Sequence, residues 1–288
     1  MEIRTLRYFL AAAKEENMSR AAEILHVTQP TLSKALKQLE TELGKKLFVR
    51  SSFSIRLTDE GILLKQRAED LISMADKIEQ EFQTLDDITG GDLYLGLAES
   101  WQISYLAAQI RIMKEKYPNL HYHITSGDSS QVIEKLEKGL LDFAVLAEEP
   151  DHSKYESIPF PQKDVWGVIM PAGDRLADKE SVSAQDLKGL PLFCSPQGWN
   201  NDIRRWASKD FGSLSLEGTF QLSYNASLFV REHLGYLLTL ENLISTSESD
   251  GLCFRPLAPK AETALYLIWK KKQVFTPIAE RFLNLILQ

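Results

Sequence analysis

Cysteine is scarce in this sequence, and long apolar runs and the short motifs of common catalytic sites are absent. The two cysteines, Cys194 and Cys253, have neither CxxC nor metal-ligand spacing, so we expect both to be ordinary buried residues. Charged residues interrupt the N-terminal stretch, and no later run approaches the ~18 apolar residues that a membrane span requires. The sequence therefore predicts a cytoplasmic protein with no membrane association, no metal and no cofactor.

Positive charge is also in short supply overall, but it is unevenly distributed. The formal net charge is −7, from 33 Lys and Arg against 40 Asp and Glu. Residues 1–58 nevertheless hold 10 basic and 6 acidic side chains, whereas residues 59–288 hold 23 and 34. A basic segment on an acidic remainder is typical of a small DNA-binding domain, because contact with phosphates requires local positive potential rather than a basic whole protein.

The first 44 residues are patterned as three helices. An apolar repeat at helical spacing predicts a first helix that ends near Asn17. Ser19 is the expected N-cap of a short second helix over 20–26, and Thr28 is the expected N-cap of a third, which carries Pro30 in its first turn and ends at Gly44. Two helices about two residues apart, the second started by a proline, predict a helix-turn-helix.

A hairpin and a long helix follow. Two strand-like segments, 46–50 and 54–57, predict a two-stranded wing. Over 59–88 the apolar residues recur in alternating steps of four and three, which predicts a long helix that pairs with the helix of a second subunit. The alternative is a surface helix that packs on its own domain. The residues expected at the pairing surface are Leu64, Leu71, Ile78 and Leu85.

Beyond Gly90 and Gly91, strand-like and helix-like segments alternate, which is typical of parallel βαβ units. One set covers 93–146 and a second covers 165–233, so we expect two α/β lobes. A strand over 264–269 and a helix over 277–287 are expected to return to the first lobe. The predicted domains are a winged helix-turn-helix (1–58), a linker helix (59–88), a first lobe (91–161 plus 264–288) and a second lobe (162–263).

Five motifs occur in a fixed order near the N-terminus. They are Ala21-Ala22, QPTLSK at 29–34, LETELG at 39–44, LFVR at 47–50 and LTDEG at 57–61. This series resembles the LysR-type transcriptional regulators densely over the first 65 residues or so. Beyond them the resemblance is carried by the order of the elements and by scattered features such as KYP at 116–118.

The resemblance implies a periplasmic-binding-protein-like effector domain and an antiparallel dimer of linker helices, usually assembled further into a tetramer on a bent operator. The implied partners are double-stranded operator DNA, a small-molecule effector, further copies of the chain and RNA polymerase. One departure concerns the wing. Many family members carry a second arginine three residues after the first, whereas Phe53 stands there in this sequence, and Arg56 lies close enough to substitute.

Eight residues are candidates for contact with DNA. Phosphate contacts supply much of the affinity, and side chains at the start of the recognition helix read base edges in the major groove. Each polar residue could instead be ordinary solvated surface, but the family motif favours contact for Gln29, Ser33 and Lys34. The candidates are Gln29, Pro30, Thr31, Ser33, Lys34, Lys37, Arg50 and Arg56.

Four loops are candidates for binding a ligand, because two-lobed α/β proteins bind ligands between the lobes at the C-terminal ends of strands. We expect a small polar metabolite, of the size of an amino acid or a carboxylic acid, that is not transformed. Glu99 would repel an anionic ligand unless it points away, so the ligand's charge is left open. Ser100 could be only an N-cap, and Trp101 and Trp199 could be packing residues. The candidates are Ser100, Trp101, Thr125, Ser126, Gln197, Trp199, Tyr224 and Asn225.

Two other classes of protein share such a fold. An enzyme would be expected to carry a recognisable catalytic motif, and no GxSxG, HExxH, GxxxxGK[ST] or GxGxxG is present. His121 and His123 alternate on one predicted strand, which favours a surface position over a metal site. A solute-binding protein of a transporter would need an export signal, which we do not find. The sequence therefore favours a DNA-binding regulator that is not an enzyme.

Overall fold

The computed structural model describes residues 1–50, 54–85, 89–247 and 250–287, and it divides into two compact units, Met1–Thr84 and Leu85–Gln288. The expectation about Phe53 falls outside the described residues. Among the residues that the structure describes, no helix is long and apolar enough to cross a membrane.

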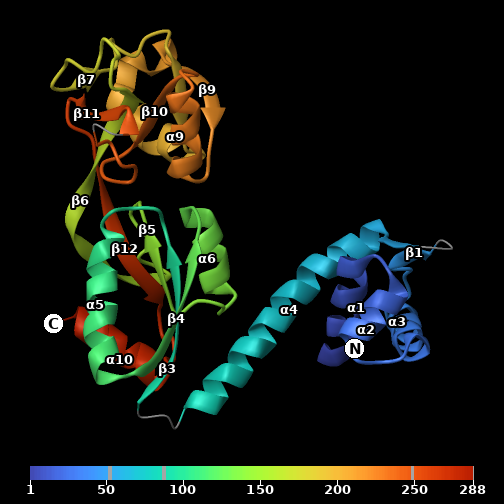
Figure 1. Cartoon of the computed structure of the whole chain (residues 1–288). Coiled ribbons are helices and arrows are strands. Elements are labelled where there is room, and N and C mark those ends of the chain that lie inside the picture. The colour runs from blue at the N-terminus through green and yellow to red at the C-terminus, as the bar shows by residue number, and fades with distance from the viewer. Residues whose placement is uncertain (51–53, 86–88, 248–249, 288) are drawn as a thin grey trace. The chain divides into compact units, whose positions relative to one another are not determined.

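The first unit is a winged helix-turn-helix followed by a long helix (Figure 1). Leu6 and Phe9 pack with Leu32, Leu36 and Leu39 in a core that excludes water. The wing hairpin pairs antiparallel, with Phe48 opposite Leu57. The elements are α1 (Ile3–Glu15), α2 (Met18–Ile24), α3 (Gln29–Leu43), β1 (Phe48–Arg50), β2 (Ile55–Leu57) and α4 (Asp59–Thr84).

Side-chain capping marks the start of α2 and α3, whereas α1 begins after Glu2 without a side-chain cap. Thr28 caps α3 as expected, because its hydroxyl accepts a hydrogen bond from the N–H of Thr31, and Gly44 ends the helix with φ of 65°. The prediction for the second helix was wrong by two residues at its cap. Asn17, which is extended, accepts hydrogen bonds from the N–H groups of Ser19 and Arg20, so α2 begins before Ser19.

The apolar stripe of the long helix α4 lies in two different environments along its length. Gly61 and Ala68 are buried against the core of the first unit, and Leu64 packs there as well. Leu71 and Ile78 are instead about half exposed. Leu64, which was expected at the pairing surface, is therefore covered by the core of its own unit. This end of the apolar stripe faces α1.

The first lobe of the second unit is a sheet with helices on both faces. Phe143 and Val145 face α5 and α10, whereas Ala144 and Leu146 face α6, as the two-residue repeat of a strand requires. The last strand and helix of the chain lie in this lobe. The elements are β3 (Gly90–Leu97), α5 (Ile103–Lys116), β4 (Asn119–Ser126), α6 (Ser129–Glu137), β5 (Phe143–Leu146), β12 (Glu262–Lys270) and α10 (Pro277–Ile286).

The second lobe repeats this arrangement with more irregular helices. Val168 and Leu238 face one apolar core, and Ile169 and Leu237 face the other. Cys194 is buried in the first of these cores and Cys253 is half-buried, and burial raises the pKa of both thiols, so they stay protonated. The elements are β7 (Val182–Ser183), β8 (Pro191–Cys194), α7 (Pro196–Gly198), a π-helix (Trp199–Ile203), α8 (Arg204–Ala207), a 3-10 helix (Ser208–Ser213), β9 (Ser215–Thr219), α9 (Ser223–Arg231), β10 (Tyr236–Leu240) and β11 (Leu252–Ala258).

One long strand, β6 (Tyr155–Pro171), runs through both lobes (Figure 1). It pairs with β12 from Tyr155 to Val165 and with β10 from Trp166 onward. The strands follow the order β4-β3-β5-β12-β6-β10-β8-β9. The expectation of parallel pairing holds for β3 with β4 and β5 in the first lobe and for β8 with β9 and β10 in the second. It does not hold for β6, which pairs antiparallel with β10 and β12 because it passes between lobes without a crossover helix.

Candidate functional sites

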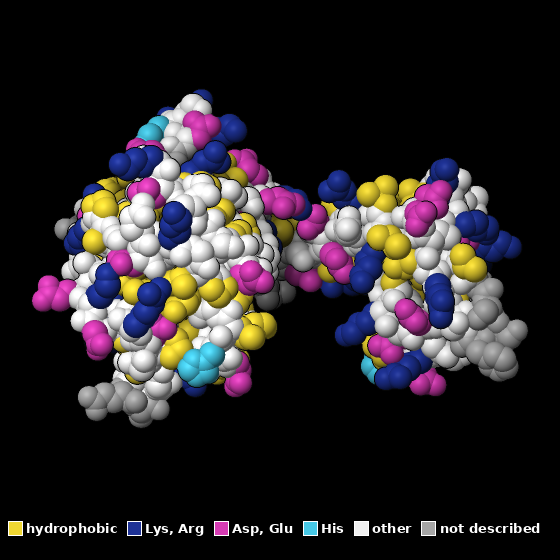
Figure 2. Space-filling view, turned by 90° about the horizontal axis from the view of Figure 1, so that it is seen from above, with side chains coloured by type: hydrophobic (Ala, Val, Ile, Leu, Met, Phe, Trp, Pro, Cys, Tyr) yellow, Lys and Arg dark blue, Asp and Glu magenta, His cyan; other side chains and the backbone are white. Residues whose placement is uncertain are grey.

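The exposed face of α3 carries most of the residues expected to contact DNA. Gln29, Thr31, Lys34 and Lys37 are exposed on its first turns, and Ser33 is half-buried. Pro30 is also exposed at the start of the helix, where its missing N–H leaves no hydrogen bond unmade. Figure 2 shows Lys and Arg side chains spread over the visible surface of this unit. The arrangement suits a helix that enters a groove of a negatively charged duplex.

The wing presents Arg56 from β2. Its side chain is exposed, and its backbone lies opposite Val49. Arg50 ends β1, opposite Ile55. The two arginines therefore belong to paired strands of the same hairpin.

A buried carboxylate joins the recognition helix to the wing. Glu40 of α3 is 5% exposed and accepts hydrogen bonds from the N–H groups of Leu47 (2.9 Å) and Phe48 (3.3 Å). The Lys46 ammonium lies 3.0 Å from the same carboxylate. Burial alone would raise the pKa of Glu40, but these hydrogen bonds and the charge of Lys46 outweigh it and lower the pKa. The ionised side chain thereby fixes the hairpin on the end of α3.

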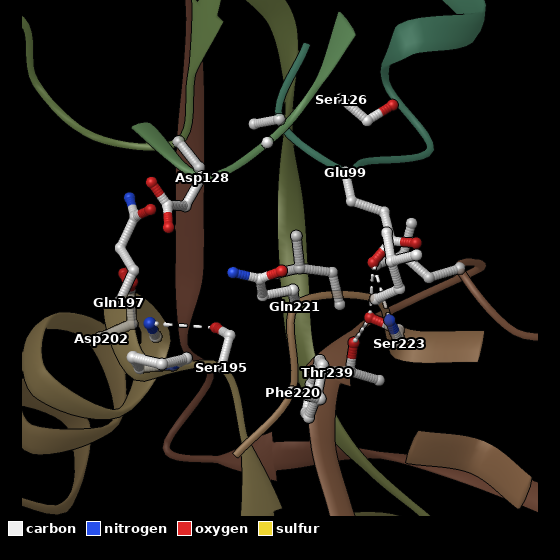
Figure 3. Close-up of a pocket in the computed structure, with 18 of the residues that line it drawn as sticks. Glu99, Ser126, Asp128, Ser195, Gln197, Asp202, Phe220, Gln221, Ser223 and Thr239 are labelled. Atoms are coloured by element: carbon white, nitrogen blue, oxygen red, sulfur yellow. Dashed lines mark hydrogen bonds between the residues drawn. The ribbon is translucent and has the colours of Figure 1, made fainter. Parts of the chain in front are cut away.

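A cavity of about 300 Å³ lies between the two lobes of the second unit (Figure 3). Its floor is partly apolar and includes Trp166, Leu238 and Leu240. Its polar wall residues come from both lobes, and they are Glu99, Ser126, Asp128, Gln131, Ser195, Gln197, Asp202, Gln221, Ser223 and Thr239. The volume and the mixed wall suit a small polar molecule with an apolar portion.

Hydrogen bonds join the two lobes at the rim of this cavity. The Glu99 carboxylate accepts from the N–H (3.0 Å) and the hydroxyl (2.8 Å) of Ser223, at the start of α9. The Gln197 side chain accepts from the N–H of Ser129 and donates to its hydroxyl. Figure 3 shows the Glu99 and Gln197 side chains on opposite sides of the cavity, with Gln221 between them. The protein thus holds its own lobes together through polar groups that face the cavity.

A second polar network lies beside the cavity, where β6 and β12 cross between the lobes. The hydroxyl of Ser100 donates to Asp164 (2.5 Å). Trp166 donates to the hydroxyl of Thr263, which in turn donates to Asp202. Burial raises the pKa of both carboxyls, and the hydrogen bonds that they accept offset only part of this effect.

The cavity contains two of the eight residues expected to bind the ligand, Ser126 and Gln197. The other six do not line it. The hydroxyl of Ser100 turns to Asp164, Trp199 packs against Phe211, and the remaining four side chains lie outside the wall. Those four are Trp101, Thr125, Tyr224 and Asn225, of which Trp101 and Tyr224 are largely exposed.

Sequence reasoning missed several wall residues. Asp128 was recognisable as the N-cap of α6, with a capping box to Gln131. Gln221 precedes α9 in a loop, and Thr239 is on β10, which was not predicted as a strand. No group of three or more His, Cys, Asp or Glu suited to hold a metal ion is present within the described ranges.

A winged helix-turn-helix in one unit and a two-lobed domain with an interlobe cavity in the other define a DNA-binding regulator with a ligand-binding domain. Two family models match the chain: "Bacterial regulatory helix-turn-helix protein, lysR family" over residues 3–62 and "LysR substrate binding domain" over residues 87–288. The chain belongs to the LysR family of transcriptional regulators. Regulators of this family bind operator DNA and small-molecule effectors and form oligomers.

Individual relatives agree with this assignment. The chain is 25% identical over 286 residues to the uncharacterized HTH-type transcriptional regulator YybE of Bacillus subtilis, covering 98% of this chain and 97% of the relative. It is 26% identical to the hydrogen peroxide-inducible genes activator of Pectobacterium carotovorum, covering 94% and 90%. The fold matches that of full-length CbnR in complex with its target DNA, with a TM-score of 0.77, 19% identity and 99% of each chain covered.

Proposed function

We propose that this regulator binds a small polar effector in the interlobe cavity and that the effector changes the protein–DNA complex without being transformed. The observation that carries the proposal is the wall of the cavity, to which polar side chains of both lobes contribute. A ligand that contacts both lobes stabilises one arrangement of the lobes over others, and only such a difference in affinity shifts an equilibrium. LysR-family regulators are generally not enzymes, and one relative is named as an activator of hydrogen peroxide-inducible genes.

For the DNA, the proposal assigns base reading to the start of α3 and phosphate contact to the basic side chains around it. Gln29 can pair with adenine through its amide, and Thr31 and Ser33 project from the same turn. Lys34 and Lys37 follow on the exposed side of the helix. Arg50 and Arg56 complete the set from the wing. Loss of a phosphate contact weakens binding to all sequences, whereas loss of a base contact changes sequence preference.

We propose that two subunits pair through the exposed apolar residues of the long helix and of the turn after it. Leu71, Ile78 and Leu85 are each 40% or more exposed, in line along the chain at heptad spacing. Such a row is costly in water and is covered when two helices pair.

The proposed functional domains are the winged head up to residue 58, the linker helix and the two lobes. The chain passes from one lobe to the other at residues 165–166 and again at residues 261–262.

The effector proposal is tested by filling the cavity. The full chain first selects a duplex from random DNA, and small metabolites are then screened for a change in its affinity for that duplex by fluorescence anisotropy. Gln221→Trp, which fills the middle of the cavity, should abolish the response to every active metabolite. Thr219→Trp, an exposed position on β9 that does not line the cavity, is the matched control and should respond as the wild type does. Active metabolites that still act on Gln221→Trp would place the effector elsewhere.

A further inference from the structure

The interlobe cavity has carboxylates in its wall but no basic side chain. Glu99, Asp128 and Asp202 lie there, and none of its described lining residues is a lysine, an arginine or a histidine. Burial raises the pKa of Asp202, and the positive charge of Arg205 offsets part of this increase. Within the described part of the chain, Glu99 and Asp128 have no such cationic partner and are held by neutral groups alone. The cavity therefore has a negative potential that a bound cation would offset.

The positions where an anion would bind are already occupied by the protein. A ligand carboxylate is stabilised at a helix N-terminus by free N–H groups and by the positive end of the helix dipole. At the start of α6, Asp128 accepts from the N–H of Gln131 (3.0 Å), and Gln197 accepts from that of Ser129. At the start of α9, Glu99 accepts from the N–H of Ser223. An anionic ligand would have to displace these groups and then lie beside the displaced carboxylates.

The carboxylate of Asp128 stays ionised at neutral pH. Burial acts to raise its pKa, but hydrogen bonds from the Ser130 hydroxyl and from the N–H groups of Gln131 and Ser130 outweigh burial and lower it. Figure 3 shows Asp128 and Glu99 on opposite sides of the cavity, with the Gln221 side chain between them. A ligand in the cavity thus meets a negative group on each side and a neutral amide acceptor in the middle.

We propose that the ligand of this cavity is a small organic cation that carries an ammonium or guanidinium group, and that carboxylate ligands without such a group are rejected. This inference rests on the proposed role of the cavity as the effector site. An ammonium donates three hydrogen bonds and a guanidinium donates five, and the acceptors here are carboxylate and amide oxygens. Opposite charge also attracts such a ligand into a partly enclosed space where water screens charges less than in bulk.

The test compares charge at constant size in the full chain. Putrescine and succinate are four-carbon molecules of opposite charge, butanediol is the neutral analogue, and agmatine adds a guanidinium. Binding is followed by calorimetry and by the intrinsic tryptophan fluorescence, to which Trp166 in the cavity floor contributes. We expect putrescine or agmatine to bind and succinate not to bind. Glu99→Gln and Asp128→Asn remove one charge each while keeping an amide oxygen to accept the same N–H bonds, so each should raise the Kd of the cation roughly ten-fold, which corresponds to about 1.4 kcal/mol.

The control is Glu217→Gln, which removes an exposed carboxylate of β9 that does not line the cavity and should leave the Kd unchanged. Succinate binding, equal cation affinity in all the variants, or failure of both cations to bind at millimolar concentration would each overturn the inference. Its failure is separable from that of the effector proposal. If anionic metabolites alter DNA affinity and Gln221→Trp abolishes that response, the cavity is the effector site and only the charge is wrong. If no response depends on Gln221, the effector proposal itself fails.

Discussion

Removing the Glu40 carboxylate should loosen the attachment of the wing to the recognition helix, although Phe48 and Ile55 still pack in the shared core. In Glu40→Ala the buried N–H groups of Leu47 and Phe48 lose their acceptor, and each unsatisfied buried donor costs about 1 to 3 kcal/mol. The Phe48 bond is the longer of the two, so we expect a total loss of about 2 to 4 kcal/mol from the unfolding free energy of the first unit. DNA affinity should fall with it, because Lys46 and Arg56 are then no longer held in place.

The assay is denaturant unfolding of the full chain, followed through the transition of the first unit. The matched control is Glu23→Ala, an exposed carboxylate on α2, which should leave that transition unchanged. Glu40→Gln should lose less than Glu40→Ala, because its amide oxygen can replace Oε1, which accepts both N–H bonds, and only the contact of Oε2 with the Lys46 ammonium is lost. A Glu40→Ala protein that unfolds at the wild-type denaturant concentration would refute the assigned role of this carboxylate.

The lowered pKa of Glu40 predicts that the unfolding free energy of the first unit decreases at acidic pH. The pKa of Glu40 in the folded protein lies below its ordinary value of 4.5, so the folded state binds the proton more weakly than the unfolded state does. The extra stability is therefore fully present above pH 4.5 and is lost as the pH falls toward the folded-state pKa. The difference in unfolding free energy between wild type and Glu40→Gln should shrink over that acidic range. A difference that stays constant there would contradict the direction of the shift.

Three further predictions concern the other sites. Leu71→Asp with Ile78→Asp should dissociate the oligomer through the long helix, and a light-scattering mass equal to that of the wild type would remove these residues from the interface. Ser100→Ala should lower the unfolding free energy of the second unit by about 1 to 3 kcal/mol, because buried Asp164 loses a donor, while ligand affinity measured by calorimetry should change little. Lys34→Ala should weaken binding to the selected duplex in a gel shift, and an unchanged salt dependence together with unchanged affinity would show that this side chain does not meet DNA.

Much of the fold could be predicted because local signals agreed with the tertiary structure. The cap at Thr28, the proline after it and Gly44 all lie at the ends of α3, where backbone chemistry alone favours them. The strands β10 and β11 were missed for opposite reasons. The first is a short apolar run that carries no two-residue alternation, and the second contains Arg255 and Pro256, which interrupt a strand-like pattern.

The site was harder to predict than the fold, because position along a strand does not determine where a side chain points. Ser100 follows a strand as a binding residue would, yet its hydroxyl turns to Asp164, a partner 64 residues away. Gln221 reaches the cavity from a loop with no distinctive pattern. Glu99 was expected to repel an anion unless it pointed away, and it instead bonds Ser223, 124 residues later in the chain. Such long-range hydrogen bonds leave no periodicity in the sequence.

The packing of Gly61, Leu64 and Ala68 into the core of the first unit makes α4 a lever arm. The first turns of the helix cannot rotate without carrying the recognition helix and the wing, since they share one close-packed core. The helix spans 26 residues, which at 1.5 Å per residue gives a length of roughly 39 Å. A tilt of about 5° about its far end therefore displaces the reading head by roughly 3 Å. That distance is close to the ~3.4 Å rise of one base pair, so a few degrees of tilt at the far end of the helix move the reading head by a distance comparable to the spacing of successive bases.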